Sequence, residues 1–111
     1  MPKVSGFFHI TLQPDVDPMD LEKFLMDEAF PYWEQLPGVK CFLVKGRDGT
    51  ILREGEYYWV YEAESEERYQ GLAPTPDEEF QRHFDAGLPM HGHIWNRLIA
   101  DFTYEGSFFV L

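Results

Sequence analysis

Cysteine and basic side chains are scarce in this sequence. Cys41 is the only cysteine among 111 residues, so an intramolecular disulfide is excluded. Nine Lys and Arg residues stand against twenty Asp and Glu residues, which gives a formal net charge of −11. A field of that sign repels phosphate backbones and anionic membranes. We therefore expect an acidic protein with neither nucleic acid nor a membrane among its partners.

Long apolar runs and the common catalytic motifs are also missing. No stretch approaches the roughly 18 apolar residues needed to cross a bilayer. The start, Met1-Pro2-Lys3, does not have the charged and then apolar layout of a secretory signal, so a cytoplasmic location is expected. No Gly-rich phosphate loop, nucleophile elbow or Ser/His/Asp triad motif is present. The sequence therefore marks no nucleotide site and no nucleophile.

What is present is the composition of a packed chain. Hydrophobic residues make up 44% and aromatic residues 17% of the sequence. A chain of this length can bury a core without disulfides or a structural metal, so we expect a single domain over residues 1–111. The acidic residues concentrate at 62–67 and 77–79, where two helices are expected to begin, and the helix dipole favours negative charge there.

The most informative segment covers residues 56–63. Alternate residues of a strand point to opposite faces, so Tyr57, Trp59 and Tyr61 lie together. Three rings with two hydroxyls and an indole N–H suit a surface that is mostly apolar but can orient a polar group. This aromatic wall predicts a small-molecule pocket or a subunit interface.

Periodicity and turn signals predict the other elements. In chain order they are a strand over 5–13, a helix beginning at Asp17-Pro18, a strand over 39–45, a hairpin at Asp48-Gly49, the strand over 56–63, helical pieces over 65–71 and 77–87, and a last strand over 98–104. Pro31 is expected to kink the first helix or end it early. Ser65 and Thr75 are expected N-caps, and Gly87 with Pro89 should end the last helix.

This order predicts an α+β fold of the ferredoxin-like βαββαβ type, a four-stranded antiparallel sheet with helices on one face. The other face would expose Phe7, Tyr57, Trp59 and Tyr61. A homodimer through the sheet face would bury these rings, and a cavity could remain beside them.

Several short patterns together resemble a known group. They are His9 two places before Thr11, a Pro-Gly turn at 37–38, a third strand ending at 64–65, and Trp-Asn-Arg-Leu-Ile over 95–99. The chain resembles the dimeric α/β-barrel (ferredoxin-like) superfamily, nearest in pattern to stress-responsive barrel proteins and olivetolic acid cyclase-like proteins. The resemblance implies that His9 lines a pocket as a strand-one His and that Trp95 is a wall residue.

Cyclase chemistry is not implied by the resemblance. In those relatives a Tyr and a His on the helix after strand three act within a Tyr-x-x-His-Pro-x-His type of motif. This chain has Tyr69-Gln70-Gly71-Leu72-Ala73-Pro74 at that place. The cyclase helix motif is therefore absent.

The candidate ligand-binding residues are Phe7, His9, Thr11, Tyr57, Trp59, Tyr61 and Trp95. His9 is the candidate catalytic residue, because an imidazole in a partly dry pocket can act as general acid or base, with Tyr57 or Tyr61 supplying a second proton. The alternative is that His9 is a hydrogen-bonded interior residue. Lys45 and Arg97 could pair with a ligand carboxylate or form ordinary surface salt bridges.

The remaining histidines do not form a convincing cofactor site. His91 and His93 have a His-x-His spacing that could supply two metal ligands from an extended segment, but no acidic or Cys ligand is suitably spaced. His83 could be placed as a haem ligand by analogy with other barrels, without the expected companions. We predict no metal and no cofactor.

Three functions fit these residues. The first is binding of an elongated apolar or aromatic small molecule, fatty-acid-like or polyketide-like, with or without cofactor-independent acid–base catalysis. The second is a non-catalytic homo-oligomeric interaction or stress-response module, in which the dimer consumes the rings. The third is a haem-linked or monooxygenase-like oxidative enzyme.

Overall fold

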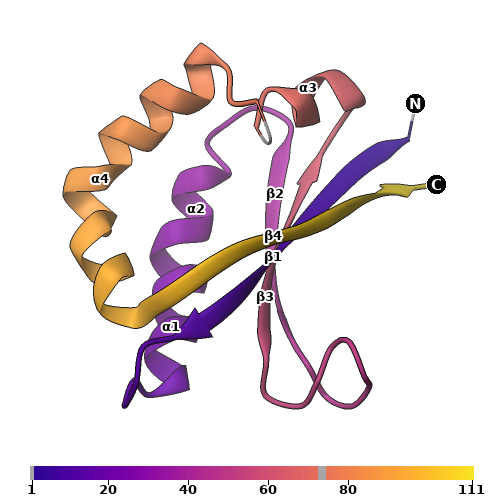
Figure 1. The fold of residues 1–111 in the computed structure, drawn as a ribbon. Coiled ribbons are helices and arrows are strands. Elements are labelled where there is room, and N and C mark those ends of the chain that lie inside the picture. The colour runs from indigo at the N-terminus through magenta and orange to yellow at the C-terminus, as the bar shows by residue number, and fades with distance from the viewer. Residues whose placement is uncertain (1, 73–74) are drawn as a thin grey trace.

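The computed structural model describes residues 2–72 and 75–111. Its elements are β1 (Lys3–Leu12), α1 (Pro18–Phe24), a π-helical stretch η1 (Leu25–Ala29), α2 (Phe30–Trp33), β2 (Val39–Lys45), β3 (Tyr57–Ala63), α3 (Glu66–Gln70), α4 (Glu78–Leu98) and β4 (Ile99–Val110) (Figure 1). The strands form one four-stranded antiparallel sheet in the order β2-β3-β1-β4. The predicted ferredoxin-like fold is confirmed.

The helices lie on one side of the sheet. In Figure 1, α1, α2 and α4 form a layer to the left of the strands, and α3 lies at the upper end. The two ends of the chain lie near each other, because β1 and β4 pair antiparallel over nearly their whole length. One sheet face is therefore covered and the other is free of helices.

The first helix begins as the sequence predicts, and a π-helical stretch directly before Pro31 lets it continue past this proline. The Asp17 carboxylate accepts a hydrogen bond from the Met19 amide at 2.9 Å, and Pro18 occupies the first turn. Just before Pro31, residues 25–29 wind as a π-helix, in which the Phe30 amide donates to the Leu25 carbonyl. A wider turn gives the proline ring room where an α-helical carbonyl would clash. The helix then ends at Trp33.

The second helical region differs from the prediction. Ser65 caps α3, as expected, by accepting from the Arg68 amide at 3.1 Å. The cap of α4 is Asp77, which accepts from the Phe80 amide at 2.8 Å, whereas the Thr75 hydroxyl donates to the Gln70 carbonyl. Asp77 lies directly before the first helical residue and is therefore the N-cap in place of Thr75. Pro74, in the expected connection between the two helical pieces, lies outside the described residues.

The predicted end of α4 at Gly87 and Pro89 is wrong. The helix continues through Pro89 to Leu98, and the last strand begins at Ile99. A proline inside a helix costs about 3 kcal/mol. Gly87 before it and Leu98 after it are buried in the fold, and tertiary packing of this kind can override local helix propensity. The strand also runs to Val110, beyond the predicted end at 104.

The connection between β2 and β3 is longer than a two-residue hairpin at Asp48-Gly49. The Gly46 amide donates to the Glu56 carbonyl at 2.8 Å, and the Gly55 amide donates to the Gly46 carbonyl at 3.0 Å. These bonds close the ladder at Gly46 and Glu56, so residues 47–54 form an extended loop, seen at the lower right of Figure 1.

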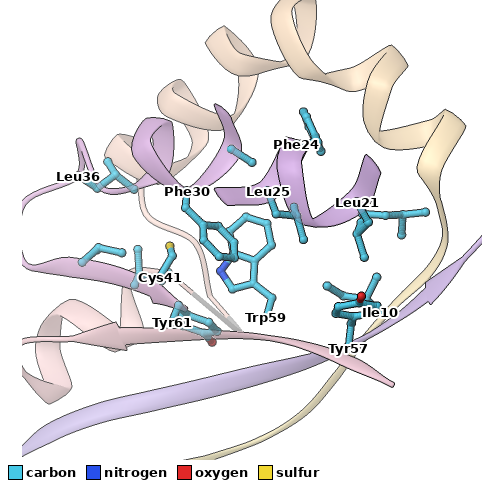
Figure 2. Packing of buried hydrophobic residues seen from close by; sticks show 14 of the residues in the cluster. Ile10, Leu21, Phe24, Leu25, Phe30, Leu36, Cys41, Tyr57, Trp59 and Tyr61 are labelled. Atoms are coloured by element: carbon cyan, nitrogen blue, oxygen red, sulfur yellow. The ribbon is translucent and has the colours of Figure 1, made fainter. Parts of the chain in front are cut away.

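The aromatic wall lies on the covered face of the sheet. In the β1–β3 register Phe8 pairs with Trp59 and Ile10 with Tyr57, so these side chains share a face. Figure 2 shows Tyr57, Trp59 and Tyr61 pointing toward the helices. They are 2%, 6% and 6% exposed. Their predicted placement on the helix-free face is wrong.

Alternation explains the error. It shows that the three rings lie together but does not say which face the helices cover. The intervening residues Tyr58 and Val60 are also apolar, so both faces of β3 look suitable for a core. Phe7 and His9 lie with Tyr58 on the opposite face, where the Phe7 and Tyr58 ring centroids are 6.0 Å apart.

Candidate functional site

A cavity of about 450 Å³ lies between the sheet and the helix layer. Six side chains from the four strands form its floor: Phe8, Val39, Cys41, Trp59, Tyr61 and Phe102. The rings of Phe8 and Phe102 stack at 4.2 Å, and Phe102 also meets the edge of Trp59 at 5.7 Å. The floor is therefore a packed aromatic surface held by the sheet.

The opposite wall comes from one side of α4. Five of its six lining residues, Phe80, Phe84, Leu88, Gly92 and Trp95, are separated by intervals of four, four, four and three, and the sixth is Asn96. Residues at these intervals lie on the same side of a helix. Phe84 and Leu88 are 41% and 48% exposed, so they mark the side of the cavity that opens to solvent.

Tryptophans connect the two walls. Trp33 on α2 stacks on Phe80 with ring centroids 5.2 Å apart, and Trp95 on α4 lies 5.9 Å from Trp59 on β3. Trp33, Trp59 and Trp95 are all the tryptophans of the chain, and all three line the cavity. Any molecule in this space would contact or closely approach them.

A reciprocal contact between α2 and α4 holds the helix wall in place. The Tyr32 hydroxyl donates to the His83 carbonyl at 2.5 Å, and His83 Nε2 lies 2.7 Å from the Tyr32 carbonyl. Gly87 makes this approach possible, because a Cβ there would lie 2.8 Å from the Tyr32 ring. His83, which could be placed as a haem ligand only by analogy, has its Nε2 bonded to the Tyr32 carbonyl.

Two groups in the cavity floor can ionise, and burial opposes both ionisations. Burial raises the pKa of the Cys41 thiol to about 12, against a smaller lowering by a hydrogen bond with Trp59. Burial likewise raises the pKa of the Tyr61 hydroxyl. Both groups are therefore neutral at physiological pH. Cys41 is a free, buried cysteine.

The Tyr61 hydroxyl is buried without a hydrogen bond among the described residues. Its ring lies across Gly6 of β1, where a Cβ would come within 2.5 Å of the hydroxyl oxygen. The Tyr69 ring is parallel to it at 5.6 Å, and the Tyr69 hydroxyl is bonded to that of Tyr104. Gly6 thus creates the space in which Tyr61 lies flat.

Three of the predicted ligand-binding residues meet at the cavity, namely Trp59, Tyr61 and Trp95. Tyr57 shares their face but lies elsewhere in the core, where its hydroxyl donates to the Glu22 carboxylate. Burial, together with Glu22, raises the pKa of Tyr57 to about 12. Tyr57 is therefore a structural residue of the α1 contact.

The other predicted residues, Phe7, His9 and Thr11, do not line the cavity. His9 lies across the sheet, with its Nε2 3.6 Å from a Glu56 carboxylate oxygen and its ring 5.0 Å from that of Tyr58. The expected pairing of His9 with Tyr57 or Tyr61 is therefore wrong, because adjacent residues of β1 face opposite sides.

Trp33 and, apart from Trp95, the α4 wall were not predicted from the sequence. The spacing of Phe80, Phe84, Leu88 and Trp95 would have identified it, had the helix been continued through Pro89. Ending the helix at Gly87 separated Trp95 from the aromatic residues before it. Trp33 carries no such signal, because its place in the site depends on how α2 packs against α4.

The histidine pair at 91 and 93 lies on α4 and not on an extended segment. Residues two apart do not face each other on a helix. His91 packs edge-on against Phe24 and Tyr32, whereas His93 is exposed. Within residues 2–72 and 75–111, no three His, Cys, Asp or Glu side chains are grouped so that they could hold a metal ion.

None of the helices in the described part of the chain is long and apolar enough to span a membrane.

Comparisons with solved structures give the same fold. A DABB family protein with a ferredoxin-like fold from Mesorhizobium loti is 14% identical, with a TM-score of 0.59 and coverage of 100% of this chain and 99% of that chain. A dimeric protein of unknown function and ferredoxin-like fold from Bacteroides fragilis is 12% identical, with a TM-score of 0.50 and coverage of 96% and 95%. An ethyl tert-butyl ether D (EthD) family protein from Bacillus halodurans is 16% identical, with a TM-score of 0.49 and coverage of 95% and 97%.

No family model and no curated protein matches the sequence. At these identities the solved structures establish the ferredoxin-like fold alone.

Proposed function

We propose that this protein binds an apolar or aromatic small molecule, of the fatty-acid-like or polyketide-like kind, between α4 and the sheet. The observation that carries the proposal is the cavity of about 450 Å³ with a lining of aromatic and aliphatic side chains. Ligand pockets commonly measure about 300–1,000 Å³ and are mostly apolar. A space of this size in a chain of 111 residues is large for a packing defect, because protein interiors are close-packed.

The composition of the opening supports the same proposal. Phe84 and Leu88 expose large apolar surfaces to water at the cavity. Covering such a surface gains roughly 25 cal/mol per Å². A ligand that fills the cavity and reaches these two side chains would gain this energy. No residue of the predicted acid–base set other than Tyr61 lines the cavity, so the proposal is binding and assigns no reaction.

The test uses the tryptophans as reporters. N-phenyl-1-naphthylamine is an uncharged dye that fluoresces in apolar surroundings and accepts excitation energy from tryptophan. Titration should quench the emission of Trp33, Trp59 and Trp95 and raise dye emission in parallel, with saturation near one dye per chain. Linear, non-saturating signals would contradict the proposal.

We also propose a homodimer through the helix-free sheet face. Phe42 on β2 and Phe108 on β4 are each 46% exposed, and Phe7 and Val60 lie between them on this face. An exposed apolar patch on a sheet is typical of an isologous interface. Because Trp59 and Tyr61 lie on the covered face, this dimer would leave the cavity open. Light scattering on the protein as it elutes from a size-exclusion column should give a molar mass twice that of one chain.

A further inference from the structure

The cavity is without formal charge, and this property restricts what can bind. Among the described residues that line it, none is Lys, Arg, His, Asp or Glu. The two lining groups that could ionise, Cys41 and Tyr61, are buried and neutral at physiological pH. A ligand therefore meets no ionic partner inside.

The cations suggested by the sequence lie elsewhere. Lys45 Nζ is 3.9 Å from a Glu22 carboxylate oxygen and 5.4 Å from the centre of the Tyr57 ring, away from the cavity. Arg97 is exposed and absent from the lining. The formal charge of −11 further disfavours anions near the opening. A carboxylate that entered would lose its hydration and gain no partner, which is costly.

Size and lining chemistry narrow the class further. A cavity of ~150 Å³ is enough to hold benzene. The present cavity of about 450 Å³ has room for a molecule of two or three rings. Aromatic rings also outnumber aliphatic side chains in the lining, and the Phe8 and Phe102 rings stack on each other in the floor. Offset or edge-on ring contacts add about 0.5–1.5 kcal/mol beyond area burial.

A flexible aliphatic ligand should bind in the same cavity with lower affinity than a rigid ring system. It loses rotational freedom on binding, whereas a fused ring system has little to lose. We propose, on the basis of the binding function above, that the ligand is an uncharged, planar aromatic molecule of two or three rings, and that anionic fatty acids are excluded.

The experiment compares four competitors that differ in one property at a time. They are 2-naphthalenemethanol, 2-naphthoate, decanol and decanoate, each used at neutral pH to displace N-phenyl-1-naphthylamine from the wild-type protein. The naphthalene alcohol should bind tightest and at least about tenfold tighter than 2-naphthoate, because only the anion loses uncompensated hydration. Decanoate should be weaker than decanol for the same reason.

A gain-of-function variant tests whether the weaker binding of the carboxylates arises in the cavity and not from their different solubility in water. Leu88 is half exposed at the opening, so Leu88→Arg should fold, and the new guanidinium should improve 2-naphthoate binding severalfold relative to the alcohol. Leu88→Gln is the matched control and should not change that ratio.

The outcomes separate the two proposals. If the dye binds and either anion competes as well as its neutral counterpart, or decanol competes better than the naphthalene alcohol, the class proposed here is wrong while the binding function stands. If neither the dye nor any competitor binds, the binding function fails, and this inference fails with it.

Discussion

Tyr32 and His83 join α2 to α4 through each other's backbone carbonyls. The Tyr32 hydroxyl donates to the His83 carbonyl, His83 Nε2 bonds to the Tyr32 carbonyl, and the two rings stack at 3.9 Å. This pair ties α4 to α2, and both helices contribute side chains to the cavity lining.

Tyr32→Phe should therefore weaken both stability and binding. The ring stack remains, but the hydrogen bond to the His83 carbonyl is lost, which costs about 0.5–1.5 kcal/mol of unfolding free energy. Urea denaturation should show this loss. Dye affinity should fall as well, because α4 is held less firmly. Unchanged stability and affinity would show that the pair does not hold the helix.

Two glycines of α4 offer a matched comparison. A Cβ at Gly87 would lie 2.8 Å from the Tyr32 ring, and the hydrogen bond of the Tyr32 hydroxyl holds that ring in place. A Cβ at Gly92 would meet only a Leu88 methyl at 3.6 Å. Gly92→Ala should stabilise the protein by about 0.5–1 kcal/mol through helix propensity.

Gly87→Ala has the same propensity gain but forces a core clash that costs about 1–3 kcal/mol. Its melting temperature should lie several degrees below that of Gly92→Ala. Equal melting temperatures for the two variants would contradict the packing of Tyr32 against Gly87.

The tyrosine cluster beneath the cavity gives a second pair. Tyr61→Phe removes a buried hydroxyl that has no hydrogen bond among the described residues, so stability should stay the same or rise. Tyr69→Phe removes the hydrogen bond to Tyr104 and should lower stability by about 1 kcal/mol. Chemical denaturation of both variants checks the order, and the reverse order would refute this assignment of hydrogen bonds.

Substitutions at two exposed phenylalanines test the proposed dimer interface and the cavity separately. Phe42→Glu places a charge on the helix-free face and should shift the mass in solution toward the monomer while dye binding persists. Phe84→Glu, at a residue of similar exposure, should weaken dye binding while the dimer persists. A single variant that abolishes both properties while folded would show that the two surfaces are not independent.

The sequence predicted the order of elements and the grouping of residues within each strand. Asp17, Pro18 and Ser65 act at helix starts as expected, because capping depends on local chemistry. Alternation likewise placed Trp59 beside Tyr61 on one face. These are short-range relationships that one segment determines by itself.

The features that were mispredicted depend on distant parts of the chain. Which face of β3 the helices cover is decided by packing, since Tyr58 and Val60 are as apolar as their neighbours. Pro89 is a local stop signal in the sequence, yet α4 continues past it to the buried Leu98, so packing overrides local propensity here. The cavity lies where α4, α2 and the sheet meet, so it cannot be predicted from the sequence of any single segment.

The measurement that tests the account most directly is dye titration of two Gly92 variants. Gly92 lines the cavity, and its helical position accepts a side chain. Gly92→Ala should bind N-phenyl-1-naphthylamine like the wild type. Gly92→Phe fills the cavity with a ring and should weaken binding by at least about tenfold, equal to about 1.4 kcal/mol. If a folded Gly92→Phe protein binds the dye as tightly as Gly92→Ala, the ligand does not occupy this cavity and the central claim is contradicted.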